Sequence, residues 1–448
     1  MSDDVQAADV LRDLVRRGFP EAEAMWKRGR TRRLTLDLDG EGSASSQERA
    51  WAVRASSRRA SFFAAGTGDL PPAGTDGVWP EPGGAPFRLP EPEPAPPWSE
   101  PSDFAAPLIG ESEGLRLLAS ISRELDAELP GSRLLHAALE DGSSETGIAN
   151  SRGLRVAYRR RLATLRLEVA GPGRPGAAAS LYLAEREARR FQPLALARRL
   201  ADRLLVAGAG PATATAGNAE SSMAGGELLL APPVAIALLS AILPLLVGPE
   251  AVARLAPLRD RRGRIGSSLL SILDNGRLPG GALECPVDGE GVPSGEAVLV
   301  EAGAFRQPLL AWWQTGGAAP GHATGCSRRP GWRDLPTPGP THLYLQPDPK
   351  VPVAALLGGI AQGSYLIDPT GRARFDPETA RFALPVCGFH IESGRATAPL
   401  PHAWLSGTAA ALFKGLAAVA RDLTFLPLDG MLGAPTLLVT GLDLHRQP

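Results

Sequence analysis

The chain has 448 residues, which is long enough for two or three domains with cores of their own. Hydrophobic residues make up 44% of it and charged residues 21%, a balance typical of a globular protein. The formal net charge is -1, from 47 basic and 48 acidic residues, so nothing favours a nucleic-acid partner. The three cysteines, Cys285, Cys326 and Cys387, lack CxxC spacing and indicate a reducing compartment. The first residues show no basic segment followed by an apolar one, so we expect no signal peptide and a cytoplasmic location.

The first 66 residues predict one helix followed by strands. Residues 9–18 place Val10, Leu11 and Leu14 on one helical face. Leucine then alternates with polar residues in "RRLTLDLDG", and "AWAVRASSRRASFFAAG" continues in short extended pieces.

Residues 71–107 differ sharply in composition, because they contain twelve prolines, many of them in x-P-x-P spacing. Such a run excludes a helix or a central strand and predicts an extended surface connection. A ligand for a proline-recognition domain is the less favoured alternative.

The next segment predicts a second helix, further strands and a third helix. Residues 112–129 have helical periodicity, and Ser112 is expected to cap that helix. The turn "NSRG" (150–153) separates two expected strands, and a helix is expected over about 185–207. We therefore predict an N-terminal α+β domain over 1–206, an antiparallel sheet flanked by helices, and a linker over 207–226.

The most apolar stretch, "LLLAPPVAIALLSAILPLLVG" (228–248), carries no charge, no histidine and no cysteine. Its length would suit a membrane span, but its prolines and the absence of aromatic belts favour a buried helix that starts near Pro233. The rest of 227–448 is predicted as a β-rich C-terminal domain, with helices at about 351–362 and 407–420.

Few residues suggest chemistry. No two of the six histidines have the spacing of zinc ligands on a helix, and no GxSxG or phosphate-binding glycine motif occurs. Asp288 and Glu290 in "DGEGVPSG" are candidates for binding a cation, although a turn between strands explains them as well. His322 and Cys326 in "GHATGC" share a glycine-rich loop in which incidental polar residues are the favoured interpretation. These four residues are the candidate substrate-binding residues.

A succession of motifs resembles the TldD/PmbA family, also described as modulators of DNA gyrase. These motifs are "LLLAPPVAIALLSAIL", "DGEGVP" before the strand "VLVEAG", "GPTHLYLQP", "GFHIESGRATAPL" and the terminal "GAPTLLVTGLDL". The N-terminal half resembles the family more weakly, through "GFPEAEAMW" and "IANSRG". The resemblance implies a two-domain TldD/PmbA-like α+β fold.

The family implies two types of subunit. TldD-type subunits carry a HExxxH zinc motif on the first helix of the C-terminal domain and a late cysteine ligand. TldE-type subunits lack these ligands and pair with TldD into a heterodimeric zinc peptidase that trims peptides, including leader or core segments of natural products. The proline-rich segment and the loop around His322 depart from the family pattern and suggest a specialised partner.

Residues 228–248 offer neither histidine nor carboxylate where the zinc motif would stand, so the chain resembles a TldE-type subunit. We expect no catalytic residue and no bound metal in this chain, zinc in a TldD-like partner, and a peptide as substrate. A stand-alone peptide-binding or scaffold protein, as a homodimer, is the alternative. A third possibility is an enzyme that uses His322, Cys326 or Asp288.

Overall fold

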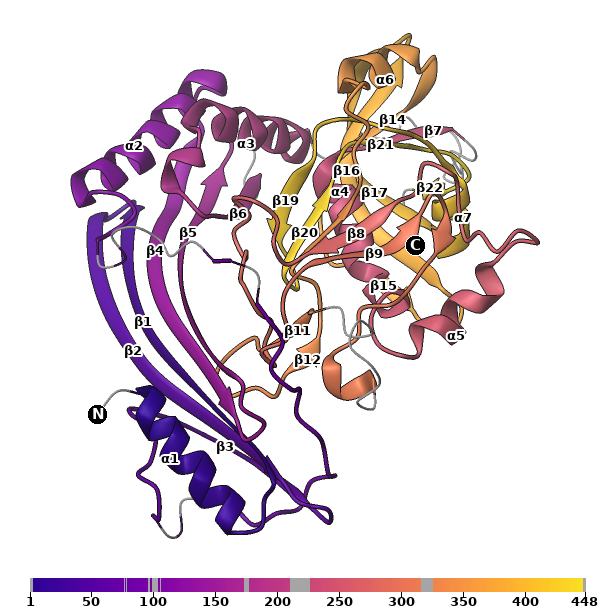
Figure 1. Cartoon of the computed structure of the whole chain (residues 1–448). Helices are drawn as coiled ribbons and strands as arrows, with labels where there is room; N and C mark the ends of the chain where they lie inside the picture. Colours follow the sequence, from indigo (N-terminus) through magenta and orange to yellow (C-terminus); the bar gives the residue numbers. More distant parts are fainter. Residues whose placement is uncertain are drawn as a thin grey trace.

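The computed structural model describes residues 3–75, 77, 79–95, 97–98, 104, 106–172, 177–209, 226–315 and 325–445. We refer to residues 3–209 as the N-terminal half and to residues 226–445 as the C-terminal half. Figure 1 shows the two halves side by side, with a long curved sheet in the first. The elements of the N-terminal half are α1 (Asp3–Arg16), β1 (Glu21–Asp37), β2 (Gly40–Ser56), β3 (Ser61–Thr67), α2 (Glu111–Glu128), β4 (Arg133–Asn150), β5 (Arg155–Ala170), β6 (Ala178–Glu185), the 3-10 helix η1 (Ala188–Arg190) and α3 (Pro193–Gly208).

The sheet of the N-terminal half is antiparallel, with strand order β3-β2-β1-β4-β5-β6. Because successive side chains of a strand point to opposite faces, Ala22, Ala24 and Trp26 of β1 pack against α1, whereas Met25 points the other way. Helices α2 and α3 pack on the same face as α1, through a core that includes Leu34 of β1. The opposite, concave face is thereby left for the C-terminal half (Figure 1).

The predicted α+β class of the N-terminal half is confirmed, with differences in detail. The turn at 150–153 joins β4 and β5 as expected. The predicted cap was wrong: α2 begins after Gly110, whose extended backbone leaves its carbonyl free to accept from Gly114, so Ser112 lies inside the first turn. The third helix begins at Pro193 rather than near 185, since the residue before a proline disfavours the helical conformation.

The described part of the proline-rich segment contains no helix and no named strand, and most of it is exposed. Leu89 is buried all the same, and its amide donates to Glu21 at 3.0 Å. Further on, Trp98 contacts Tyr158, and the carbonyl of Ala106 accepts from Arg161. Tyr158 and Arg161 are three positions apart in β5, so their side chains point to opposite faces of the sheet. The segment therefore contacts both faces of β5, at residues that β6 does not pair with.

The C-terminal half contains two large sheets and a short strand pair. One sheet has the order β10-β9-β8-β13-β20-β19, and the other β18-β21-β7-β14-β16-β17-β22 with β15 beside β16. Its helices are α4 (Pro232–Ala241), η2 (Leu243–Leu245), α5 (Ala251–Leu255), η3 (Ala256–Leu258), η4 (Trp312–Thr315), α6 (Val353–Gly359) and α7 (Ala409–Lys414). Its strands are β7 (Glu227–Leu230), β8 (Ile272–Asn275), β9 (Glu296–Glu301), β10 (Ala304–Phe305), β11 (Ser327–Arg328), β12 (Thr337–Pro338), β13 (His342–Leu345), β14 (Gln362–Pro369), β15 (Arg374–Asp376), β16 (Arg381–Glu392), β17 (Arg395–Thr408), β18 (Leu416–Val419), β19 (Thr424–Pro427), β20 (Met431–Ala434), β21 (Leu437–Val439) and β22 (Asp443–His445).

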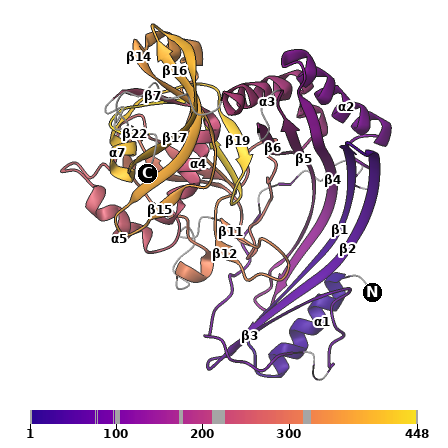
Figure 2. The ribbon, with the colours of Figure 1, turned by 180° about the vertical axis from the view of Figure 1, so that it is seen from behind.

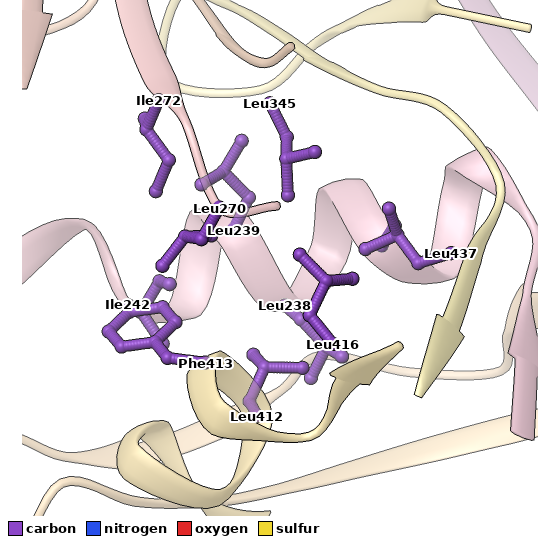
Figure 3. A pocket seen from close by; sticks show the side chains of 11 residues that line it. Leu238, Leu239, Ile242, Leu270, Ile272, Leu345, Leu412, Phe413, Leu416 and Leu437 are labelled. Atoms are coloured by element: carbon purple, nitrogen blue, oxygen red, sulfur yellow. The ribbon is translucent and has the colours of Figure 1, made fainter. Parts of the chain in front are cut away.

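Helix α4 is the central element of this half, because it contacts strands of both large sheets. Val234, Ile236 and Leu238 are almost completely buried, so the predicted buried helix is confirmed. A cavity of about 30 Å³ lies against α4, and Figure 3 shows Leu238 and Leu239 among the apolar side chains that line it. Within the described ranges, none of the helices combines the length and the apolar character needed to cross a membrane.

Two other predicted helices are shorter than expected. α6 occupies only residues 353–359. α7 ends at Lys414 because Gly415 packs directly on the backbone of Thr440, where a β-carbon would lie 2.0 Å from the carbonyl oxygen. The chain then continues as β18, paired with β21. The expected linker falls mostly on residues 210–225, outside the described residues, and the predicted domain boundaries stay a prediction.

Candidate functional site

A hollow of about 140 Å³ lies between the concave face of the first sheet and loops of the C-terminal half, and we call it the Asp288 hollow. Figures 1 and 2 both show β11 and β12 between the curved sheet and the rest of the C-terminal half. Strands β1, β4 and β5 contribute Met25, Lys27, Thr146, Ile148, Tyr158 and Arg160 to its walls. The C-terminal half contributes Cys285, Val287, Asp288, Gly289, Ser327, Arg328, Arg329, Pro330, Gly331, Trp332 and Thr341.

Asp288 is buried at the edge of this hollow, and its carboxylate closes the surrounding loop. One oxygen accepts from the amides of Glu290 at 2.8 Å and Val292 at 3.0 Å, and the other accepts from the amide of Ser327 at 2.9 Å. Burial, followed by the neighbouring Glu290, raises the pKa of Asp288 to about 7. Both oxygens are engaged by the backbone, which favours the turn over a cation-binding role.

Glu290 belongs to a buried cluster of four charges, Glu23, Arg54, Glu290 and Arg329, which we call the charge quartet. Arg54 donates to both oxygens of Glu23, at 2.9 and 2.8 Å, and to Glu290 at 3.3 Å. Arg329 also pairs with Glu23, and its Nε donates to the carbonyl of Gly289 at 2.9 Å. The quartet therefore joins β1 and β2 to the loop that carries Asp288.

Burial and neighbouring charges act differently on the two carboxylates of the quartet. Burial alone would raise the pKa of Glu23, but Arg54 and Arg329 together outweigh it and lower that pKa. Burial raises the pKa of Glu290, with Arg54 opposing and Glu23 adding to the rise. Glu290 also accepts the amide of Trp312 at 2.9 Å, so both of its oxygens have donors.

The walls of the Asp288 hollow carry an excess of positive charge. Lys27 pairs with Glu48 at 3.1 Å, but among the described residues neither Arg160 nor Arg328 has an ion-pair partner. The guanidinium of Arg160 instead lies 6.0 Å from the ring of Tyr158. Such a surface can hold an anionic group of a ligand.

Of the two remaining sequence candidates, Cys326 does not join this arrangement. Cys326 is buried in the apolar core of the C-terminal half, although its neighbour Ser327 contacts Asp288. Its thiol lies 3.5 Å from the carbonyl of Leu310. His322 lies outside the described residues, so its relation to Cys326 stays a prediction.

Sequence reasoning missed most of the residues around the hollow. Arg54, Arg160 and Arg329 come from segments far apart in the chain, and nothing in their spacing links them. The alternation along β1 could have shown that Glu23 and Met25 share a face. It could not have shown what covers that face.

Helix α4 lacks the side chains that a zinc site requires. It contains only Pro, Val, Ala, Ile, Leu and Ser, and none of these is a zinc ligand in proteins. Ser240, its one polar side chain, lies 3.3 Å from a carboxylate oxygen of Asp429. Within the part of the chain that the structure describes, no group of three His, Cys, Asp or Glu side chains could hold a metal ion.

Comparison with known proteins gives one matching family model, the PmbA/TldA metallopeptidase C-terminal domain, over residues 226–446. A curated relative, the metalloprotease TldD homolog of Buchnera aphidicola, is 24% identical over 171 residues. That match spans 38% of this chain and 35% of the relative.

Three solved structures are similar over nearly their whole length. TldE from Thermococcus kodakarensis has a TM-score of 0.80 at 19% identity, over 98% of this chain and 99% of that one. A candidate modulator of a DNA gyrase from Thermotoga maritima has a TM-score of 0.74 at 17% identity, over 95% and 96% of the two chains. A similar candidate from Bacteroides thetaiotaomicron has a TM-score of 0.74 at 14% identity, over 99% and 98%. At these identities the structures show a common fold.

Proposed function

The chain belongs to the TldD/PmbA family, and from this premise we propose that it is a non-catalytic, TldE-like subunit of a heterodimeric zinc metallopeptidase that trims peptides. The observation that carries the proposal is the composition of α4. In a family whose domain model is that of a metallopeptidase, this helix offers no zinc ligand and no general base.

The role of such a subunit is to shape the peptide channel and to support the zinc site of a TldD-like partner with HExxxH. The similarity in fold to TldE of Thermococcus kodakarensis, over nearly the whole of both chains, supports this assignment. In the Asp288 hollow, Arg160 and Arg328 form no ion pair with any described residue, and they supply a surface suited to acidic parts of a peptide. Cys285 and Cys387, which are buried and form no disulfide within the described residues, suit a cytoplasmic complex.

The proposal is tested by expressing this chain alone, a HExxxH-containing partner alone, and both together. Zinc content and cleavage of a peptide mixture are measured for each purified sample. We expect zinc and cleavage from the co-purified pair and none from this chain alone. A partner whose first HExxxH histidine is changed to alanine serves as the control and should pair without cleaving.

Two results would contradict the proposal. Zinc-dependent cleavage by this chain alone would make it an enzyme in its own right. A homodimer that binds peptides and forms no complex with a HExxxH partner would instead support the stand-alone binding protein.

A further inference from the structure

A second cavity, of about 460 Å³, lies where α3 meets the C-terminal half, and we call it the α3 pocket. Figure 1 shows α3 reaching toward β16 and β19. The pocket is lined by Arg199, Asp202, Arg203, Ala231, Pro232, Pro233, Tyr365, Ile367, Phe389, Ala396 and Thr424. None of these residues lines the Asp288 hollow.

The two arginines of the α3 pocket differ in their hydrogen bonds and ion pairs. Arg203 is buried, pairs with Asp368 and donates to the carbonyl of Ser180. Arg199 has no hydrogen bond and no ion pair with any described residue. Its Nη2 atom is inaccessible to solvent, so a ligand in the pocket would meet the other guanidinium nitrogens. A sequestered guanidinium nitrogen without an acceptor is costly, and it is uncommon in a folded protein.

The charge of Arg199 is not balanced by the carboxylates nearby. Burial, followed by the like charge of Arg203, lowers the pKa of Arg199 to about 10, so it remains protonated at neutral pH. Asp368 is already paired with Arg203. Asp202 is exposed at the rim and forms no ion pair within the described part of the chain.

The other walls of the α3 pocket are suited to an apolar group attached to an anion. Tyr365, Ile367 and Phe389 line it together with the two prolines that begin α4. Thr424, the first residue of β19, completes the lining.

We propose that the α3 pocket binds the C-terminal carboxylate of a peptide. The carboxylate accepts hydrogen bonds from the guanidinium of Arg199, and the apolar wall contacts the last side chain. The assignment of the ligand as a peptide rests on the proposed function. The assignment of a carboxylate rests on Arg199 alone.

The test is isothermal titration of this chain, without any partner, with three probes. These are N-acetyl-Ala-Leu-Phe with a free carboxylate, the same peptide as its C-terminal amide, and N-acetyl-Ala-Leu-Glu as its amide. We expect the free acid to bind at least about tenfold more tightly than either amide. Because no partner subunit is present, the result does not depend on whether the chain supports a peptidase.

Variants locate the site. Arg199→Gln should remove the preference for the free acid, and Ala396→Trp should block binding by filling the pocket from its exposed rim. Arg198→Gln is the matched control, because Arg198 is the neighbouring arginine, is exposed and pairs with Glu128. It should bind like the unaltered chain. Thermal melts identify any variant that fails to fold. If Arg199→Gln fails to fold, the three-probe comparison and Ala396→Trp still test the proposal.

The proposal is overturned if the free acid binds no better than its amide, or if the acid preference survives in both Arg199→Gln and Ala396→Trp. Equal binding of the glutamate amide and the free acid would overturn the assignment to a chain end, since the pocket would then accept an acidic side chain.

Discussion

At the scale of single residues, the unusual feature is the number of buried charges where the two halves meet. In the charge quartet, Glu23 is 1% exposed, Arg54 4% and Glu290 0%. Taking charges out of water is costly, and their attraction compensates only with good geometry and further hydrogen bonds. The bidentate contact of Arg54 with Glu23 and the backbone donor to Glu290 provide both. Removing one member should therefore cost more than the pair contributes.

Arg54→Gln should lower the free energy of unfolding by about 3–5 kcal/mol, because among the described residues it leaves two buried carboxylates with Arg329 as their one nearby cation. Urea unfolding followed by circular dichroism measures the change. Arg49→Gln is the control on the same strand: Arg49 forms an exposed pair with Asp69, and its loss should cost less than about 1 kcal/mol. Equal effects of the two variants would show that the quartet does not hold the halves together.

His342 should make the chain sensitive to mild acid. Its Nδ1 lies 2.9 Å from the carbonyl of Asn275 and its Nε2 accepts the amide of Leu283 at 3.1 Å, so the ring is neutral. Burial lowers the pKa of His342 to about 4. Because the folded pKa lies below the unfolded value of about 6.5, stability is lost as the pH falls from about 6.5 to 4, by up to about 3 kcal/mol.

To isolate this effect, the free energies of unfolding of the unaltered chain and of its His342→Gln variant are compared from melts at pH 7, 6, 5 and 4. The difference in free energy of unfolding between the two proteins should shrink as the pH falls. A difference that stays constant over this range would show that His342 does not take up its proton upon unfolding.

At the scale of elements, α4 explains why its sequence resembles a membrane segment. It is apolar on all sides because it lies between two sheets rather than on the surface of one. Its leucines pack with side chains from β8, β13 and α7, among others. The helix is therefore part of the core of the C-terminal half.

Leu238→Ala should lower the free energy of unfolding by about 3–5 kcal/mol, since it enlarges a cavity that is already present beside α4. Leu269→Ala is the matched control: Leu269 is 42% exposed and adjoins the cavity residue Leu270. It should cost less than about 1 kcal/mol. If the two variants unfold alike, α4 is not the packing centre that the structure indicates.

The elements were predictable to the extent that local pattern decides them. Hydrophobic periodicity located α1 and α2, a continuous apolar run with prolines near its start located α4, and turn residues located the β4–β5 hairpin. Strands β1 and β2, of 17 residues each, exceeded the short pieces expected, because residues 27–33 of β1 and 40–49 of β2 lack an alternating apolar pattern. The end of α7 depends on the contact of Gly415 with Thr440, which lies 25 residues further along the chain and cannot be read from local sequence.

At the scale of the whole molecule, the proline-rich segment ties the curved sheet to the C-terminal half. The ring of Trp98 lies 6.4 Å from that of Tyr158, and the guanidinium groups of Arg186 and Arg277 lie 5.5 and 6.0 Å from it. Arg277 also donates to the carbonyl of Pro97 at 2.9 Å. The composition of this segment predicted an extended connection, but these contacts exist only once the halves are assembled. The same holds for the Asp288 hollow and the α3 pocket, which residue spacing did not reveal.

Trp98→Ala should lower the free energy of unfolding by about 2 kcal/mol, less than a fully buried tryptophan because Trp98 is half-buried. It should also speed hydrogen exchange of residues 155–162, the part of β5 that the segment contacts and β6 does not pair with. Glu81→Ala, at an exposed position of the same segment, should change neither quantity. Unchanged exchange in Trp98→Ala would mean that the segment does not protect β5.

The charge quartet also bears on the order in which the chain is made. Glu23 and Arg54 are synthesised first and face each other across the β1–β2 hairpin, whereas Arg329 follows Glu23 by 306 positions. The four charges thus divide into two electrically neutral sets, one from each half. In a growing chain, the N-terminal half therefore carries no net charge at this site before the C-terminal half is made. When the C-terminal half packs against the N-terminal half, each surface buries a positive and a negative charge together.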